Sequence, residues 1–274
     1  MGDGSDSEIM FESLPSLKKW YNLFALYAIQ ILVFIGVMVF FWWISSNFWY
    51  GAIFGQVIVS TLLVIHFIYI ANNAEKIKEK HRKKYGELAG QSFWYFYQSY
   101  TIPVICAAYY FPIFLTNYNF LPRIISMPSH FITASLFSIY IAIPLGVFVL
   151  IFGFLMKRSS GGYGEYEDNY LPVMYPEKSK LITGGMYRYI RNPQYLSRGI
   201  ISMGFGVIAN NLSAILVGFM HLVSYCAIIP AEDKELARRF GNDFQNYRRE
   251  VPALFPRYGN WRKFLRFILS KQKE

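Results

Sequence analysis

Six long apolar runs divide the chain, and each is close to the ~20 residues that a helix needs to cross the hydrocarbon of a bilayer. They lie at about 22–44, 51–71, 92–115, 131–155, 193–210 and 213–230. Hydrophobic residues make up 54% of the chain and charged residues 16%, whereas a soluble domain carries about 25% charge. The pattern predicts an all-α, polytopic membrane protein with about six transmembrane helices.

Prolines interrupt the third and fourth runs, at Pro103, Pro112 and Pro144. Membrane helices tolerate proline as a kink, because neighbouring groups satisfy the backbone carbonyl that loses its partner. We expect these residues to shift the ends of the two helices and to leave the helices themselves in place.

Lysine and arginine concentrate in alternate connections. Residues 76–84, 157–191 and the tail after Arg238 are basic, whereas the loop at 116–130 and the turn at 210–212 are nearly uncharged. Basic loops stay on the cytoplasmic side, so both termini are predicted to face the cytoplasm. The chain has a net charge of +10, and its basic residues cluster beside the ends of the apolar runs. They are therefore expected to bind anionic membrane lipids at the basic loops, and their clustering there argues against nucleic acid as a partner.

Cysteine and histidine are few and dispersed. Cys106 and Cys226 lie in separate apolar runs without a CxxC pattern. The four histidines are His66, His81, His130 and His221. Because a metal site needs clustered ligands, the sequence predicts neither a metal site nor a disulfide framework.

Two polar segments bracket the last pair of apolar runs, at 181–195 and 230–256. Asn192 before Pro193 is typical of a helix start, where free N–H groups and the helix dipole attract anions. Three arginines could strengthen such an anion site, Arg188, Arg191 and Arg198. The alternative is that these arginines only follow the cytoplasmic excess of positive charge and bind lipid phosphates.

A tight turn joins the last two predicted helices, so their cytoplasmic ends should be neighbours. Glu232 and Asp233 would then face the start of the fifth helix. An acidic pair beside the membrane needs a partner, either a ligand or nearby arginines. A cationic helix start opposite two carboxylates suits a zwitterionic ligand such as S-adenosylmethionine. The predicted roof of this site consists of three tyrosines, Tyr187, Tyr189 and Tyr195.

The two segments resemble the integral membrane methyltransferases that include isoprenylcysteine carboxyl methyltransferase and the phospholipid N-methyltransferases. The family pattern runs Gly-x-Tyr-Arg-Tyr-x-Arg-His-Pro-x-Tyr, a helical hairpin, then Glu-Glu-x-x-Leu, Phe-Gly, Tyr-x-x-Tyr and Val-Pro. Its order and spacing match LITGGMYRYIRNPQY and EDKELARRFGNDFQNYRREVPALFP. The chain departs from the pattern with Asn192 for histidine, Asp233 for the second glutamate and Phe244 for the first tyrosine.

The resemblance implies S-adenosylmethionine as cofactor, with Arg191 and Glu232 as catalytic residues. The implied cofactor pocket consists of Leu181, Gly185, Tyr187, Arg191, Asn192, Pro193, Tyr195, Glu232 and Asp233. It also implies two regions. Residues 1–156 would be a transmembrane region of four helices that shapes the acceptor site, and 157–274 a methyltransferase-like region with a cytoplasmic loop, a hairpin, a cytoplasmic helix and a basic tail.

The function expected from the resemblance is methyl transfer to a lipidic or prenylated acceptor, either a phospholipid amine or a prenylcysteine carboxylate. Two alternatives remain open: an NADPH-dependent membrane reductase of the sterol type, which shares a similar hairpin, and a non-enzymatic transporter or scaffold. The tail from Gly259 is expected to form an amphipathic helix in the membrane interface. Its apolar residues are Trp261, Phe264, Leu265, Phe267 and Ile268.

Overall fold

A computed structural model of the chain describes residues 19–48, 51–86, 89–110, 135–160 and 180–270. The α-helices in these residues are α2 (Trp20–Asn47), α3 (Gly51–Asn72), α4 (Ala74–Tyr85), α5 (Ala89–Ile105), α6 (Ile139–Ser159), α8 (Pro193–Ala209), α9 (Leu212–Glu250) and α10 (Trp261–Leu269). The described residues hold no β-strand, only an isolated bridge between Ser135 and Asn211. The predicted all-α class is confirmed.

Within the described residues, four helices are long and apolar enough to cross a membrane. These spans are Trp20–Ile44, Ile53–Asn72, Ile139–Ser159 and Leu212–Glu250. The helices α5 and α8 have 17 residues each, which is the short end of the range for a spanning helix. Large apolar side chains such as Leu32 and Phe148 are more than two-thirds exposed on the outside of the bundle. This exterior suits lipid, and the fold is that of a polytopic membrane protein.

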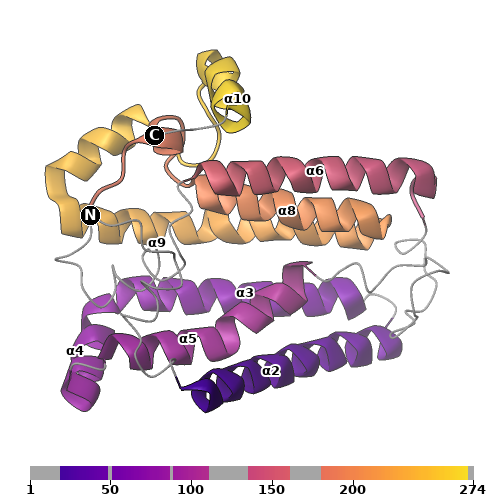
Figure 1. The fold of residues 1–274 in the computed structure, drawn as a ribbon, viewed down its shortest axis with the longest axis horizontal. Coiled ribbons are helices and arrows are strands. Elements are labelled where there is room, and N and C mark those ends of the chain that lie inside the picture. Colours follow the sequence, from indigo (N-terminus) through magenta and orange to yellow (C-terminus); the bar gives the residue numbers. More distant parts are fainter. Residues whose placement is uncertain (1–18, 49–50, 87–88, 111–134, 161–179, 271–274) are drawn as a thin grey trace.

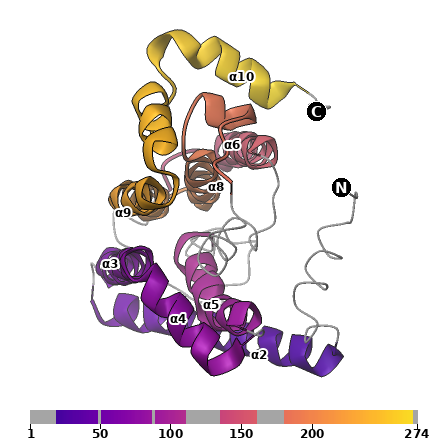
Figure 2. The ribbon, with the colours of Figure 1, turned by 90° about the vertical axis from the view of Figure 1, so that its left-hand side faces the viewer.

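Six of the described helices form two layers of three helices each. Figures 1 and 2 show α2, α3 and α5 on one side and α6, α8 and α9 on the other, with α3 packed against α9 between the layers. The short helix α4 and the last part of α9 lie at the same end of the bundle, on the left in Figure 1.

The third predicted helix begins at Ala89 and ends its described part in a π-helical turn, Cys106–Tyr110. Pro103 lies inside α5, three residues before this turn. A π turn lets one extra residue into the helix and is frequent at functional sites. The remainder of the predicted run at 92–115, Pro112 included, lies outside the described residues.

The fourth predicted helix, 131–155, starts later than expected, at Ile139. Residues 131–134 lie outside the described part, and 135–138 are not helical. The physical reason is that the side chain of Asn210 hydrogen-bonds the backbone of Phe137. The Asn210 side chain accepts from the N–H of Phe137 at 2.9 Å and donates to the Phe137 carbonyl at 2.7 Å, so the groups that a helix would use are already bonded.

The last pair of helices forms the predicted hairpin. Asn210 takes a left-handed conformation, with φ of 58°, and the side chain of Asn211 caps α9 by accepting from the N–H of Ala214 at 2.8 Å. The predicted end of the last helix at residue 230 is wrong, because α9 continues through Pro230 to Glu250. The part of α9 before a break at Gly241, residues 212–240, is ~44 Å long at ~1.5 Å per residue and so exceeds the ~30 Å of hydrocarbon. The charged part from Glu232 onward therefore extends beyond the membrane.

Glycines let α8 approach its two neighbours closely. A methyl group at Gly204 of α8 would lie 2.8 Å from the Leu150 side chain of α6, and one at Gly218 of α9 would lie 2.6 Å from Cα of Met203. Small residues are the usual means by which membrane helices pack at short distance. The hairpin and α6 therefore form a tightly interlocked unit that holds the start of α8.

The C-terminal helix α10 packs on protein with part of its apolar face. Phe264 and Ile268 are buried in a core that includes Met156 of α6 and Ile190. A helix forms where the sequence predicted one, and its position in the membrane interface stays a prediction. Leu269 remains 67% exposed.

We expect Gly218→Ala to lower the stability of the detergent-solubilised protein by about 1–3 kcal/mol, because the new methyl group meets the Met203 backbone. Thermal unfolding followed by circular dichroism measures this change. The matched control is Gly36→Ala in α2, where no atom lies within 4 Å of the new methyl group. Equal midpoints for the two variants would contradict the close packing of α8 on α9.

Candidate functional site

The site lies where α8 begins and where α9 leaves its apolar part. A 3-10 turn, Gly185–Arg188, leads into it. The chain then returns after α9 and runs beside this entry: the N–H of Arg191 donates to the Pro252 carbonyl at 2.8 Å, and that of Asn192 to the Ala253 carbonyl at 3.0 Å. The start of α8 is thereby tied to residues about 60 positions later.

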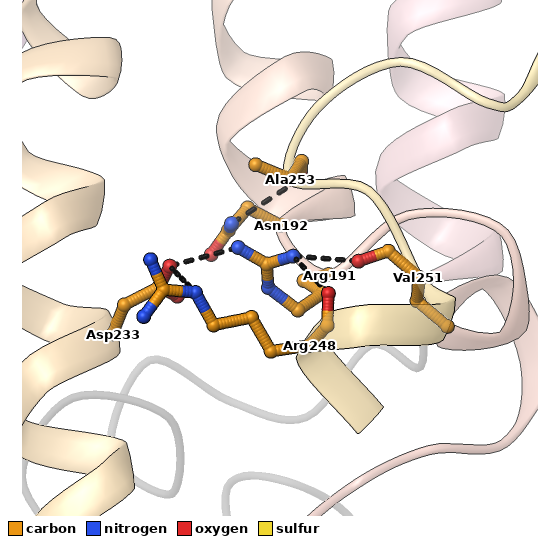
Figure 3. A network of polar contacts seen from close by, with 6 residues as sticks. All are labelled: Arg191, Asn192, Asp233, Arg248, Val251 and Ala253. Carbon is orange, nitrogen blue, oxygen red and sulfur yellow. Dashed lines mark hydrogen bonds and ion pairs between the residues drawn. The ribbon is translucent and has the colours of Figure 1, made fainter. Parts of the chain in front are cut away.

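Arg191 is the centre of a network of polar contacts, shown in Figure 3. Its Nη2 bonds Oδ2 of Asp233 at 2.8 Å, and its Nη1 donates to the carbonyls of Val251 and, at 3.4 Å, Arg248. The Arg248 side chain approaches the same Asp233 oxygen at 3.3 Å. The Arg191 and Asp233 side chains are 9% and 7% exposed, so little solvent competes for these contacts.

The salt bridge identifies the partner of Asp233. Its carboxylate contacts two arginines, Arg191 and Arg248. This confirms, for Asp233, the alternative in which nearby arginines are the partners of the acidic pair. Both Nη atoms of Arg191 are engaged with protein groups, and its buried Nε has no hydrogen-bond partner within the described part of the chain. Arg191 therefore holds together three segments: the entry to α8, the start of the charged part of α9, and the return after Arg248.

Glu232, the neighbour of Asp233, faces a different group. It accepts a hydrogen bond from the hydroxyl of Tyr195 on α8. The Tyr195 ring lies flat on that of Tyr225, with centroids 4.2 Å apart and planes 9° apart. Successive helical residues point about 100° apart, so the Glu232 carboxylate meets Tyr195 on α8 while that of Asp233 meets Arg191 and Arg248.

The electrostatics of Glu232 follow from its surroundings. Burial raises the pKa of its carboxyl above the ordinary range, against the hydrogen bond from Tyr195 and the charge of Arg198, which favour the ionised form. The charge of Asp233 acts in the raising direction. A carboxyl group with a raised pKa can take up a proton near neutral pH or accept a hydrogen bond from an ammonium or hydroxyl group.

Contacts are described for two of the three tyrosines predicted as a roof, and the roof itself stays a prediction. The Tyr189 ring packs on Phe264 and Phe267 of the C-terminal helix. The carbonyl of Tyr187 accepts from the hydroxyl of Tyr247 at 2.8 Å, and burial raises the pKa of Tyr247, which keeps that hydroxyl protonated.

Asn192 does not cap α8. Its side chain makes no cap bond and instead donates to the Ala253 carbonyl at 3.3 Å, because the return segment offers an acceptor at that place. Pro193 occupies the first turn of α8 as predicted. Leu181 and Gly185 lie on the segment before this helix, and Gly185 has a positive φ of 55°. Of the predicted arginines, Arg188 is exposed.

Sequence reasoning missed Arg248 and Tyr225. In a straight helix, Arg248 would lie ~22 Å along the axis from Asp233, 15 positions earlier. Gly241 makes the contact possible: its φ of 53° and ψ of −128° break the helix, and the last part of α9 turns back, as Figure 1 shows on the left. The glycine inside a helical pattern was the available signal. Tyr225 lay in an apolar run and resembled packing bulk.

No group of three or more histidine, cysteine, aspartate or glutamate side chains that could hold a metal ion is found in the described residues. At the site, a buried carboxyl group with a tyrosine partner lies beside the network of Arg191, Arg248 and Asp233. Such a site can bind and orient a cationic or zwitterionic group.

We expect Asp233→Asn to lower the stability of the protein by about 3 kcal/mol or more, because it leaves two arginines, one of them buried, without their counter-charge. Chemical denaturation in mild detergent measures this loss. Asp243→Asn is the matched control, since Asp243 is exposed. If both variants unfold at the same denaturant concentration as wild type, the network around Asp233 does not stabilise the folded protein.

Comparison with known proteins finds a family model that matches the part of the chain containing this site. A model of the phospholipid methyltransferase family matches residues 130–243, which include the hairpin, Arg191 and both acidic residues. No solved structure matches the chain.

Individual relatives are similar over shorter stretches. The protein-S-isoprenylcysteine O-methyltransferase of Schizosaccharomyces pombe is 25% identical over 46% of this chain and 53% of its own. The corresponding B enzyme of Arabidopsis thaliana is 27% identical over 40% and 57%. The nickel-cobalt-cadmium resistance protein NccN of Alcaligenes xylosoxydans xylosoxydans is 31% identical over 31% and 40%. The chain thus spans about half the length of the curated relatives that it matches.

Proposed function

Because a model of the phospholipid methyltransferase family matches residues 130–243, we propose that this protein is a membrane enzyme that transfers a methyl group from S-adenosylmethionine to a lipidic or prenylated acceptor. The family match is the observation that carries this proposal. The family name supports a phospholipid amine as acceptor, and the two similar isoprenylcysteine O-methyltransferases support a prenylcysteine carboxylate. These comparisons favour methyl transfer over the reductase and transporter alternatives.

The proposed cofactor pocket is the end of the hairpin. Its residues are Leu181, Gly185, Tyr187, Arg191, Asn192, Pro193, Tyr195, Glu232 and Asp233. The contacts support different roles within this set. Glu232, bonded to the Tyr195 hydroxyl, is the group we assign to direct contact with cofactor or acceptor. Arg191, with both Nη atoms bonded to protein, keeps the pocket in shape through Asp233 and the return segment.

When bound, the sulfonium of S-adenosylmethionine supplies an already activated methyl group. The protein then has to hold the acceptor in line with that group and exclude water. A carboxylate acceptor needs no base, whereas an ammonium acceptor must first lose a proton. Glu232 is suited to take that proton, because burial raises the pKa of its carboxyl group.

The acceptor is proposed to enter from the bilayer. The exterior of both helix layers is apolar, and the site lies where the hairpin leaves the membrane. We propose that residues 1–156 shape the acceptor site, that 157–274 form the methyltransferase-like region, and that both termini face the cytoplasm. The basic helix α4 shares its end of the bundle with the charged part of α9 (Figure 1), which supports anionic lipids as partners of this face.

We expect the purified protein to bind S-adenosylmethionine with micromolar affinity, and Glu232→Gln to weaken binding by about 10- to 100-fold through loss of a charged hydrogen-bond partner. Isothermal titration calorimetry measures both constants. Glu250→Gln, at an exposed position of the same helix, should bind as wild type. Folded wild-type protein that binds NADPH and no S-adenosylmethionine would sink the methyltransferase proposal in favour of the reductase.

Methyl-labelled S-adenosylmethionine should label a phospholipid extract or a prenylated cysteine peptide in detergent, because the acceptor is expected to reach the site through lipid. Thin-layer chromatography of the products identifies the acceptor, and the Glu232→Gln protein provides the background. Labelling confined to water-soluble acceptors would overturn the entry of the acceptor from the bilayer.

A further inference from the structure

A column of aromatic rings, of which Tyr225, His221 and Tyr109 are buried, joins the candidate site to the other helix layer. Tyr195, bonded to Glu232, stacks on Tyr225. The Tyr225 hydroxyl and Nε2 of His221 share a hydrogen bond of 3.0 Å. The His221 ring in turn lies flat on Tyr109, with centroids 3.8 Å apart and planes 3° apart. The column thus runs from the start of α8 along α9 to the π-helical turn after α5.

Tyr109 anchors the far end of this column. Its hydroxyl bonds Ser60 on α3 at 2.9 Å and Ser224 on α9 at 3.1 Å. Its carbonyl accepts from the hydroxyl of Ser202 on α8 at 2.7 Å. Tyr109 is 1% exposed, so these three contacts fix one residue of the N-terminal layer against both helices of the hairpin.

The column is an unusual feature for the interior of a membrane bundle. Apolar side chains of similar volume would fill this space without polar atoms, and a polar group buried there is costly unless it is bonded. Two ring stacks and two sets of hydrogen bonds instead set the orientation of each ring. Within the column, Nδ1 of the buried His221 has no hydrogen-bond partner in the described residues. Packing alone does not explain this choice of residues.

We infer that His221 is a positioning residue of the candidate site: clamped on Tyr109 and bonded to Tyr225, it fixes the Tyr195 ring and, through it, the Glu232 carboxylate. The inference rests on the proposed function for its kinetic readout. Tyr109 lies outside residues 130–243, the part that matches the family. The column is therefore a physical route by which the N-terminal layer sets the geometry of the site in the C-terminal layer.

The test uses two variants that each remove the hydrogen bond and keep an aromatic ring, His221→Phe and Tyr225→Phe. The chain offers a matched control pair, because Tyr100 and His66 share a bond of the same kind at 2.9 Å in the N-terminal layer. His221→Phe and Tyr225→Phe should each weaken S-adenosylmethionine binding or lower kcat/KM by about 3- to 30-fold. His66→Phe and Tyr100→Phe should leave both values within twofold of wild type.

A double-mutant cycle separates positioning from a general loss of stability. In the Tyr195→Phe background the link to Glu232 is already cut, so adding His221→Phe should change binding by less than about twofold. Full additivity of the two effects would mean that His221 does not act through Tyr195, and would overturn the inference.

A second readout does not depend on the cofactor. Fluorine NMR of a fluorotyrosine placed at position 195 reports the orientation and the surroundings of that ring directly. His221→Phe should shift or broaden its resonance, and His66→Phe should not. An unchanged resonance overturns the inference even where wild-type protein binds S-adenosylmethionine. Failure of wild-type protein to bind the cofactor, with the resonance still shifted by His221→Phe, overturns the proposed function and keeps the positioning role.

Discussion

The close approach of α8 to both of its neighbours is the constraint on which the rest of the structure depends. Where glycine faces backbone or a large side chain, as at Gly204 and Gly218, the helices cannot slide or rotate without a clash. In a bilayer, where lipid competes for apolar contact, such tight packing is the main source of helix association. It also decides that the start of α8 and the middle of α9 meet at one height.

The site is a consequence of that fixed height. Two acidic residues follow each other in α9, and helical geometry turns their side chains in different directions. Asp233 then closes a network with Arg191 and the return segment, while Glu232 meets Tyr195. The first contact keeps the chain folded over the start of α8, and the second presents a buried carboxyl group. The two adjacent acidic residues thus have different roles, one in the fold and one in the site.

The two helix layers are connected by polar contacts inside an apolar bundle. Tyr109, in the π-helical turn, reaches α3, α8 and α9 through its hydroxyl and its carbonyl. Because each bond has a direction, the layers are held in one relative orientation, which apolar packing alone specifies less strictly. A region that lies outside the family match therefore contributes to the geometry of the region inside it.

Periodicity and composition were sufficient to predict the apolar helices and the hairpin. A membrane helix bonds its backbone groups internally and faces lipid with apolar side chains, so it is visible in the sequence as a long apolar run. Local spacing also predicted that Arg191 and Tyr195 would lie near Glu232 and Asp233, since a tight turn returns the chain to the same end. Helix ends were predicted less well: Ile139 begins α6 because the side chain of Asn210, more than 70 positions away, captures the Phe137 backbone.

The sequence by itself thus determined the membrane class, the hairpin and the residue types of the site. Only the tertiary structure decided which carboxylate bonds Arg191 and which bonds Tyr195, that Tyr189 turns toward the C-terminal helix, and that Arg248 returns to Asp233 through the break at Gly241. The physical reason is that these outcomes depend on the direction of side chains and on contacts between distant segments. A pattern of residue types along the chain specifies neither of them.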